Sequence, residues 1–129
     1  MMKVFISQPM SGLTEEEVMV VKQTALDFLS GVYGEITTVD NYNHIDVPEN
    51  AGSIWHLGTS IRQMEECDAI YFVDGWETAR GCCIEYFICK YYNLRVLNSE
   101  IDDVRKDQFN NIGKMVIDIM SKLYLFNKW

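Results

Sequence analysis

The sequence predicts an α/β protein in which helices cover both faces of a parallel sheet. Short apolar segments rich in β-branched and aromatic residues alternate along the chain with longer segments of helical periodicity. Strands that alternate with helices in this way are joined by right-handed crossovers and form a parallel sheet. One of the apolar segments, residues 70–73, has the character of a central strand that is buried on both faces.

The length and composition indicate one domain with an ordinary packed core. The chain has 129 residues, of which 48% are hydrophobic, and a chain of this size buries roughly two thirds of its unfolded surface. No internal repeat, low-complexity tract or linker divides it. We therefore expect a single domain over residues 1–129, in which residues 98–129 form a C-terminal helical extension.

The first strand and the first helix are the best marked elements. Residues 3–7 are apolar and β-branched, and they run directly into a turn that contains proline and glycine. Thr14 followed by Glu17 is the pattern of a capping box, which predicts a helix that starts near Thr14. The helix is expected to end at the glycines that follow it, Gly31 and Gly34.

The remaining elements continue the alternation. Further strands are predicted at 35–39, 70–73 and 94–97, and further helices at 53–67, 80–92 and 110–124. The charged segment 101–107 is expected to be a turn of helix or a loop. In the polar loop 40–52, Asn41, Asn43 and His44 are more typical of turn formers or solvated groups than of ligands. This order predicts a flavodoxin-like or Rossmann-like three-layer sandwich with a parallel sheet of four to five strands.

Charge and hydropathy narrow the class of partner. The formal net charge of -8 argues against a nucleic-acid duplex, because phosphate backbones require a basic protein face. No apolar run approaches the 18 residues that a membrane-spanning helix needs, and no signal-peptide pattern opens the chain. We therefore expect a cytoplasmic protein with no membrane partner.

The cysteines and the glycines indicate neither a metal nor a cofactor. Cys82 and Cys83 are adjacent, which suits neither a disulfide framework nor a metal site, so the four cysteines are expected to be free, small apolar residues in a reducing compartment. The patterns GxxxxGK[ST] and GxGxxG are absent, so nothing in the sequence predicts tightly held ATP or NAD.

Two segments are candidates for a site. Ligands of open α/β sheets bind where strands end and the next helices begin, which predicts that residues 74–85 form one wall of a site. Glu85 lies about a turn inside the helix of that segment. The segment 7–12 leads into a helix N-terminus, where free N–H groups could bind an anion. The alternative is that Ser11 and Gly12 form only a turn between strand and helix.

Two stretches together resemble the DUF4406 family, a group common in phage and bacterial genomes. They are VFISQPMSG, at 4–12, and the spaced pattern CDAI, DGWE, RG and Glu85, at 67–85. The resemblance covers nearly the whole of residues 1–97 and leaves the C-terminal segment outside. This family belongs to the nucleoside 2-deoxyribosyltransferase-like superfamily. The resemblance implies a flavodoxin-like homo-oligomer, a dimer or higher, that handles nucleosides or nucleotides.

The resemblance also implies a mechanism and a set of site residues. Enzymes of the superfamily cleave the N-glycosidic bond with a glutamate that attacks C1′ of the deoxyribose, and this catalytic residue maps to Glu85. The implied substrate-binding residues come from the loop after the first strand and from the turn after the third: Ser7, Gln8, Pro9, Met10, Ser11 and Gly12, then Asp74, Gly75, Trp76, Arg80 and Gly81.

Three positions depart from the catalytic members of the superfamily. Phe5 stands where they keep a tyrosine, Ser60 where they keep an aspartate, and Ala79 where a serine helps to hold phosphate. Because catalytic groups act as a unit, such losses can lower the rate by orders of magnitude. The sequence therefore leaves three alternatives: a glycosidase or deoxyribosyltransferase, a non-catalytic binding or sequestering module for a nucleotide-derived ligand, and an oligomeric scaffold with a vestigial pocket.

Overall fold

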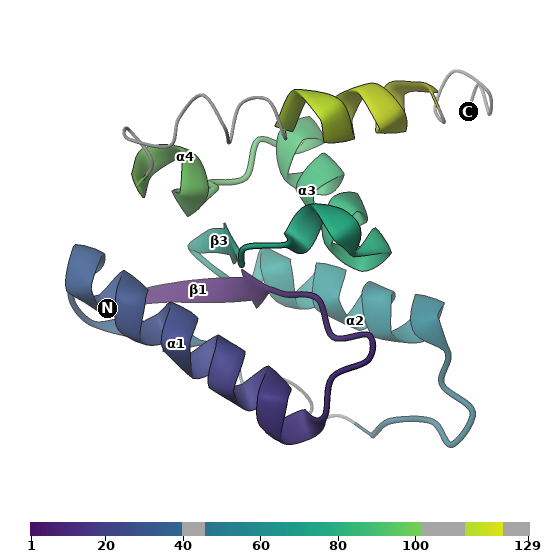
Figure 1. Cartoon of the computed structure of the whole chain (residues 1–129), viewed down its shortest axis with the longest axis horizontal. Coiled ribbons are helices and arrows are strands. Elements are labelled where there is room, and N and C mark those ends of the chain that lie inside the picture. Colours follow the sequence, from purple (N-terminus) through teal and green to yellow (C-terminus); the bar gives the residue numbers. More distant parts are fainter. Residues whose placement is uncertain (40–45, 102–112, 123–129) are drawn as a thin grey trace.

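The structure is a computed structural model that describes residues 1–39, 46–101 and 113–122. Its sheet contains three parallel strands in the order β2-β1-β3: β1 (Met2–Ser7), β2 (Ile36–Thr38) and β3 (Ala69–Phe72). The helices are α1 (Glu15–Tyr33), α2 (Ser53–Glu65), α3 (Arg80–Tyr91) and α4 (Leu97–Ile101), with a 3-10 turn, η1 (Trp76–Thr78), before α3 and one more helix over 113–122 (Figure 1). The predicted α/β architecture with a parallel sheet is confirmed.

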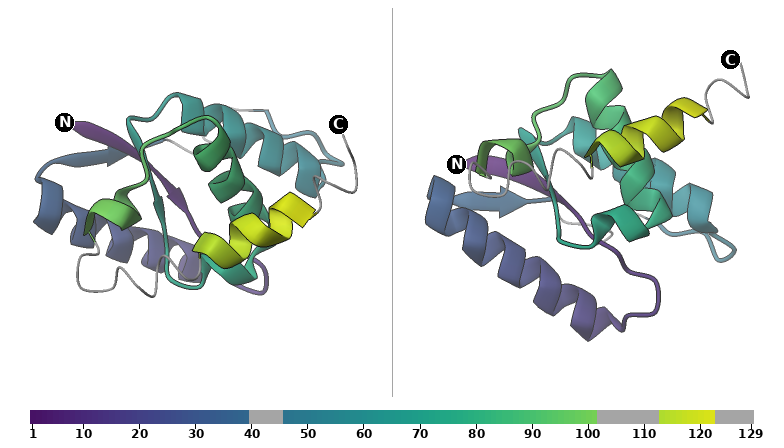
Figure 2. Two further views of the ribbon diagram at one scale, coloured as in Figure 1. Left: turned by 90° about the horizontal axis from the view of Figure 1, so that it is seen from above. Right: turned by 45° about the horizontal axis from the view of Figure 1, so that its top comes forward.

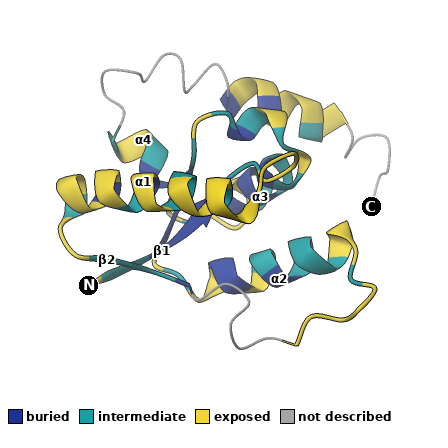
Figure 3. Ribbon diagram, turned by 60° about the horizontal axis from the view of Figure 1, so that its bottom comes forward, coloured by how far each residue is buried: buried dark blue, intermediate teal, exposed yellow. Residues whose placement is uncertain are grey.

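Each face of the sheet has its own hydrophobic core. Along β1, Val4 and Ile6 pack with residues of α1 and α4, whereas Phe5 packs with residues of α2 and α3. This alternation follows from the period of two along a strand. Figure 2 shows the helices on either side of the sheet, and Figure 3 shows that the outer face of α1 is exposed. Ser7 continues the series of Phe5, so its side chain lies on the α3 side of the sheet.

The first helix begins as the sequence predicts. The amide of Glu17 donates to Thr14 Oγ1 at 3.1 Å, and the amide of Thr14 donates to Glu17 Oε1 at 3.2 Å. This capping box satisfies backbone N–H groups that would otherwise lack a partner. The helix ends at Gly34, whose φ of 84° favours glycine.

An aspartate joins the start of β3 to β1. The amide of Lys3 donates to Asp68 Oδ2 at 2.8 Å, and the amide of Asp68 donates to the carbonyl oxygen of Lys3 at 2.8 Å. The register that follows pairs Ser7 with Phe72 at the carboxyl ends of the two strands. Asp68 thus helps to set which residues of the two strands end side by side.

The strand predicted for residues 94–97 is wrong. Only Val96 pairs with β3, as a single parallel bridge to Ile70, and Leu97 already begins α4. Beyond the bridge, the side-chain amide of Asn98 takes the place of a strand backbone. It donates from Nδ2 to the carbonyl oxygen of Phe72 at 2.8 Å and accepts at Oδ1 from the amide of Phe72 at 2.9 Å. The sheet of the described residues therefore has three strands rather than four to five.

Replacing Asn98 with alanine should lower the free energy of unfolding by about 2 kcal/mol, because two hydrogen bonds are lost and the backbone groups of the buried Phe72 lose their partners. Urea denaturation, monitored by circular dichroism, would measure the change in the free energy of unfolding. The neighbouring variant Ser99→Ala is the control, since the Ser99 hydroxyl bonds within its own turn, to the carbonyl oxygen of Val96. Equal stability of Asn98→Ala and Ser99→Ala would contradict this role for Asn98.

The C-terminal helix packs against α3. Val116 is buried in the core that contains Phe72 and Tyr86, and Gly113 lies so close to α3 that a Cβ there would be 2.8 Å from Tyr86 Oη. The helix predicted for 110–124 is confirmed over 113–122. The rest of that helix, the tail, residues 102–107, and Asn41, Asn43 and His44 lie outside the described residues.

Candidate functional site

The two candidate segments meet through one hydrogen bond. Ser7, the last residue of β1, donates from Oγ to Glu85 Oε1 of α3 at 2.8 Å, across 78 residues of sequence. Both residues are buried: Ser7 is 1% exposed and Glu85 is 6% exposed. The structure thus brings together the predicted catalytic residue and the first residue of the loop, residues 7–12, that is predicted to bind the sugar or the 5′-phosphate.

The burial of Glu85 follows from the small residues on its helix. Cys82 precedes it by one helical turn, Cys89 follows it by one turn, and both are buried in the core, as the sequence predicts for small apolar residues. All four cysteines are free. Burial raises the pKa of the Cys82 and Cys89 thiols to about 12, so the carboxyl group is flanked by neutral sulfur groups.

The carboxyl group of Glu85 titrates near neutrality. Burial raises its pKa from 4.5 to about 7, and the hydrogen bond from Ser7 acts in the opposite direction because it favours the carboxylate. At pH 7 the acid and carboxylate forms are therefore both populated. A group with this pKa suits proton transfer or nucleophilic attack at physiological pH.

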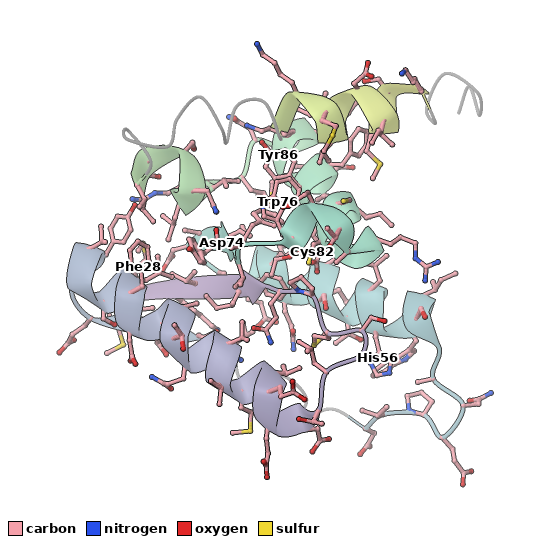
Figure 4. The ribbon with its side chains drawn as sticks, viewed as in Figure 1. Phe28, His56, Asp74, Trp76, Cys82 and Tyr86 are labelled. Carbon is pink, nitrogen blue, oxygen red and sulfur yellow. The ribbon has the colours of Figure 1, made fainter. Side chains whose placement is uncertain are left out.

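The turn between β3 and α3 divides its side chains between core and surface. Gly75 has a φ of 91°, a backbone conformation that favours glycine, and it redirects the chain into η1. Trp76 is 3% exposed and stacks on Tyr86 with ring centroids 4.6 Å apart (Figure 4). Asp74 and Arg80 are exposed. Trp76 therefore packs in the core beneath the turn. It stays a prediction that a substrate contacts Asp74, Gly75, Trp76, Arg80 and Gly81.

The loop after β1 is anchored at its start and open at its end. Gln8 Nε2 donates to the carbonyl oxygen of Val18 in α1 at 3.1 Å, and Pro9 is half-buried. The end of the loop is exposed: Met10, Ser11 and Gly12, the last with a φ of 80°. Among the loop residues predicted to bind substrate, the structure therefore places only Ser7 in contact with Glu85.

The N-terminus of α1 is poorly suited to an anion. Its first turn contains Glu15, Glu16 and Glu17, and the capping box already uses the amides of Thr14 and Glu17. This arrangement favours the alternative that Ser11 and Gly12 form a turn only. The N-terminus of α3 differs, because its N-cap residue, Ala79, makes no side-chain hydrogen bond and its first turn has no acidic residue.

The three positions that depart from the enzymes the sequence resembles, Phe5, Ser60 and Ala79, differ in burial. Phe5 is buried in the core between the sheet and α2 and α3, so it offers the site no hydroxyl group. Ser60 is half-buried in α2, and Ala79 is half-buried ahead of α3. Phe5, Ser60 and Ala79 contribute no charge, so the site has Glu85 as its buried carboxyl group.

The described residues contain neither a metal-binding cluster nor a membrane-spanning helix. No three histidine, cysteine, aspartate or glutamate side chains among them are grouped so that they could hold a metal ion. Within the same residues, no helix has the length and hydrophobicity that spanning a membrane requires.

Comparison with known proteins identifies the family. The family model for a domain of unknown function, DUF4406, matches residues 2–98. The chain belongs to the DUF4406 family. No curated protein and no solved structure matches it. The DUF4406 match includes Ser7, Glu85 and the turn between β3 and α3, and it ends at Asn98, before the helix over 113–122.

Proposed function

We propose that this DUF4406 protein is a member of the nucleoside 2-deoxyribosyltransferase-like superfamily that cleaves or transfers the N-glycosidic bond of a deoxynucleoside or deoxynucleoside monophosphate. Glu85 is its nucleophile. The observation that carries the proposal is the buried hydrogen bond between Ser7 and Glu85. We also propose a cytoplasmic location, in keeping with the free cysteines. A homo-oligomer is proposed from the family resemblance.

The position of this pair in the fold supports a ligand site. In the order β2-β1-β3 the chain leaves β1 toward one side and returns on the other, so the carboxyl end of β1 is a topological switch point. The helices that follow β1 and β2 lie on opposite faces of the sheet, as the two cores show. Ser7 and Glu85 lie at the end of the sheet where ligands of such folds bind.

The chemistry requires Glu85 as a carboxylate. Its oxygen forms a bond to C1′ of the deoxyribose while the C1′–N bond breaks, and the departing base takes the bonding electrons and a proton from solvent. Water or a second base then attacks C1′ and releases the carboxylate, which gives hydrolysis or transfer. The buried carboxylate stabilises the positive charge that develops on the sugar better than a solvated one would. The Ser7 hydroxyl supports the ionised form.

A binding module is the second candidate. Phe5 supplies no hydroxyl donor and Ser60 supplies no carboxylate to assist Glu85, and Phe5 is buried in the core. A protein of this kind would hold a nucleotide-derived ligand at the same place without breaking it.

Incubation with deoxynucleosides and their monophosphates, with free base followed by chromatography, tests the proposal. Base release should rise with pH between about 6 and 8 as Glu85 ionises. Glu85→Gln should reduce it to background, because an amide cannot attack C1′. The exposed Glu65→Gln is the control. Tight binding in calorimetry without base release would favour the binding module, and equal release by Glu85→Gln would refute the role of Glu85.

A further inference from the structure

The side chain of Gln8 ends in a buried oxygen that has no partner among the described residues. Gln8 follows Ser7 directly, at the carboxyl end of β1, and its Oε1 atom is one of two buried side-chain atoms for which the described part of the chain offers no hydrogen-bond partner. A buried carbonyl oxygen without a partner costs about 1–3 kcal/mol. Such an atom in a folded protein calls for an explanation, and a ligand donor is one.

The other end of the same amide fixes which atom is free. Gln8 Nε2 donates to the carbonyl oxygen of Val18 at 3.1 Å. Rotation of the amide by 180° would set Oε1 against that carbonyl oxygen, and two acceptors repel each other. The free position is therefore an acceptor, and it can be satisfied only by an O–H or N–H group.

The surroundings of Gln8 disfavour a phosphate. Residues 7–18 contain three glutamates and no lysine or arginine. All three glutamates, Glu15, Glu16 and Glu17, are in the first turn of α1, the helix to which Gln8 is bonded. A phosphate ester at neutral pH offers acceptors almost alone, so beside Gln8 it would face both the oxygen of Gln8 and this acidic turn, with no lysine or arginine within residues 7–18.

We propose that Gln8 is a specificity-determining residue that accepts a hydrogen bond from a sugar hydroxyl, so that the substrate is a free deoxynucleoside and not its monophosphate. This inference rests on the proposed function, because Glu85 defines where the sugar lies. Ser7 contacts Glu85, and Gln8 is the next residue, one strand step of about 3.3 Å along the chain. Ser7 bonds to Glu85 of α3 and Gln8 bonds to Val18 of α1, so the two side chains flank the carboxyl end of β1, where the proposed sugar would lie.

The experiment compares the four deoxynucleosides with their 5′- and 3′-monophosphates, by base release and by calorimetric binding. Wild-type protein should prefer the deoxynucleosides at least tenfold. Gln8→Met, which has nearly the same length but no acceptor, should lower kcat/KM or affinity for deoxynucleosides about tenfold, the effect of one hydrogen bond. Glu15→Gln with Glu16→Gln leaves the capping box intact and should reduce the discrimination against monophosphates about threefold.

Each result decides between the inference and the proposed function. A preference for deoxynucleosides that decreases in Gln8→Met supports both the inference and the proposed function. Binding of deoxynucleosides without base release supports the inference and refutes the glycosidase. Base release from monophosphates at an equal or higher rate overturns the inference and leaves the proposed function standing. If neither binding nor base release is observed, both the inference and the proposed function are overturned. Should Gln8→Met fail to fold, the surface pair Glu15→Gln and Glu16→Gln still tests the charge effect.

Discussion

Replacing Trp76 with alanine should lower the free energy of unfolding by about 3–5 kcal/mol, the range for a large aromatic side chain removed from a core. Trp76 is buried against Phe72 and Tyr86, with ring centroids at 5.2 and 4.6 Å. Its loss would leave a cavity beneath the turn that leads from β3 into α3. Chemical denaturation of both proteins, with the midpoint and slope compared, would measure the change.

Tyr92→Ala is the matched control, since Tyr92 is an aromatic residue at the opposite, C-terminal end of α3 and is 75% exposed. Its removal should change the free energy of unfolding by less than about 0.5 kcal/mol. Unchanged stability of Trp76→Ala, combined with lost ligand affinity, would mean that Trp76 contacts a ligand, as the resemblance implies, rather than supporting the turn.

Replacing Glu85 with glutamine should stabilise the protein at high pH and leave its stability nearly unchanged at low pH. The folded-state pKa of Glu85, about 7, lies above its ordinary value of 4.5. Between pH 4.5 and about pH 7, Glu85 is ionised in the unfolded chain but still protonated in the folded protein. The free energy of unfolding therefore falls as the pH rises through this range. Above pH 7 the penalty is complete and reaches about 3 kcal/mol, at 1.4 kcal/mol for each pKa unit. Glutamine is never charged, and its amide oxygen can still accept the hydrogen bond from Ser7.

Thermal melts of wild-type protein and Glu85→Gln at pH 4.5 and pH 8.5 would test this. The melting temperatures should be close at pH 4.5, and the variant should melt several degrees higher at pH 8.5. Glu65→Gln, an exposed change on α2, controls for the general loss of one negative charge from a chain of net charge -8. A stability difference that is the same at both pH values would show that Glu85 has no raised pKa.

The ionised form of Glu85, which the proposed chemistry uses, is thus expected to destabilise the fold. The Ser7 hydroxyl offsets part of the cost of burying the carboxylate. A residue that only filled the core would be better replaced by an apolar side chain, since an ionised group without full compensation is unfavourable there. This cost is the pattern that active-site carboxylates commonly show.

The sequence by itself determined the elements whose signals are local. The capping box of α1, the apolar segments of β1 and β3 and the helical extension all follow from spacing within a few residues, because helix caps, helical faces and strand alternation depend on near neighbours. The resemblance added the prediction that Ser7 and Glu85 are site residues. It could not predict the hydrogen bond between them, because that contact depends on the register of β1 against β3 and on the burial of α3.

The tertiary structure alone decided the rest. Leu94 to Leu97 has the composition of a strand, yet the amide of Asn98 pairs with Phe72 and the backbone turns into α4 after a single bridge. Trp76 follows a glycine turn and could have faced a ligand, but stacking on Tyr86 places it in the core. Both outcomes depend on partners distant in the sequence. Local sequence patterns determine which secondary structures a segment can form. Long-range packing determines which of its side chains remain available to a ligand.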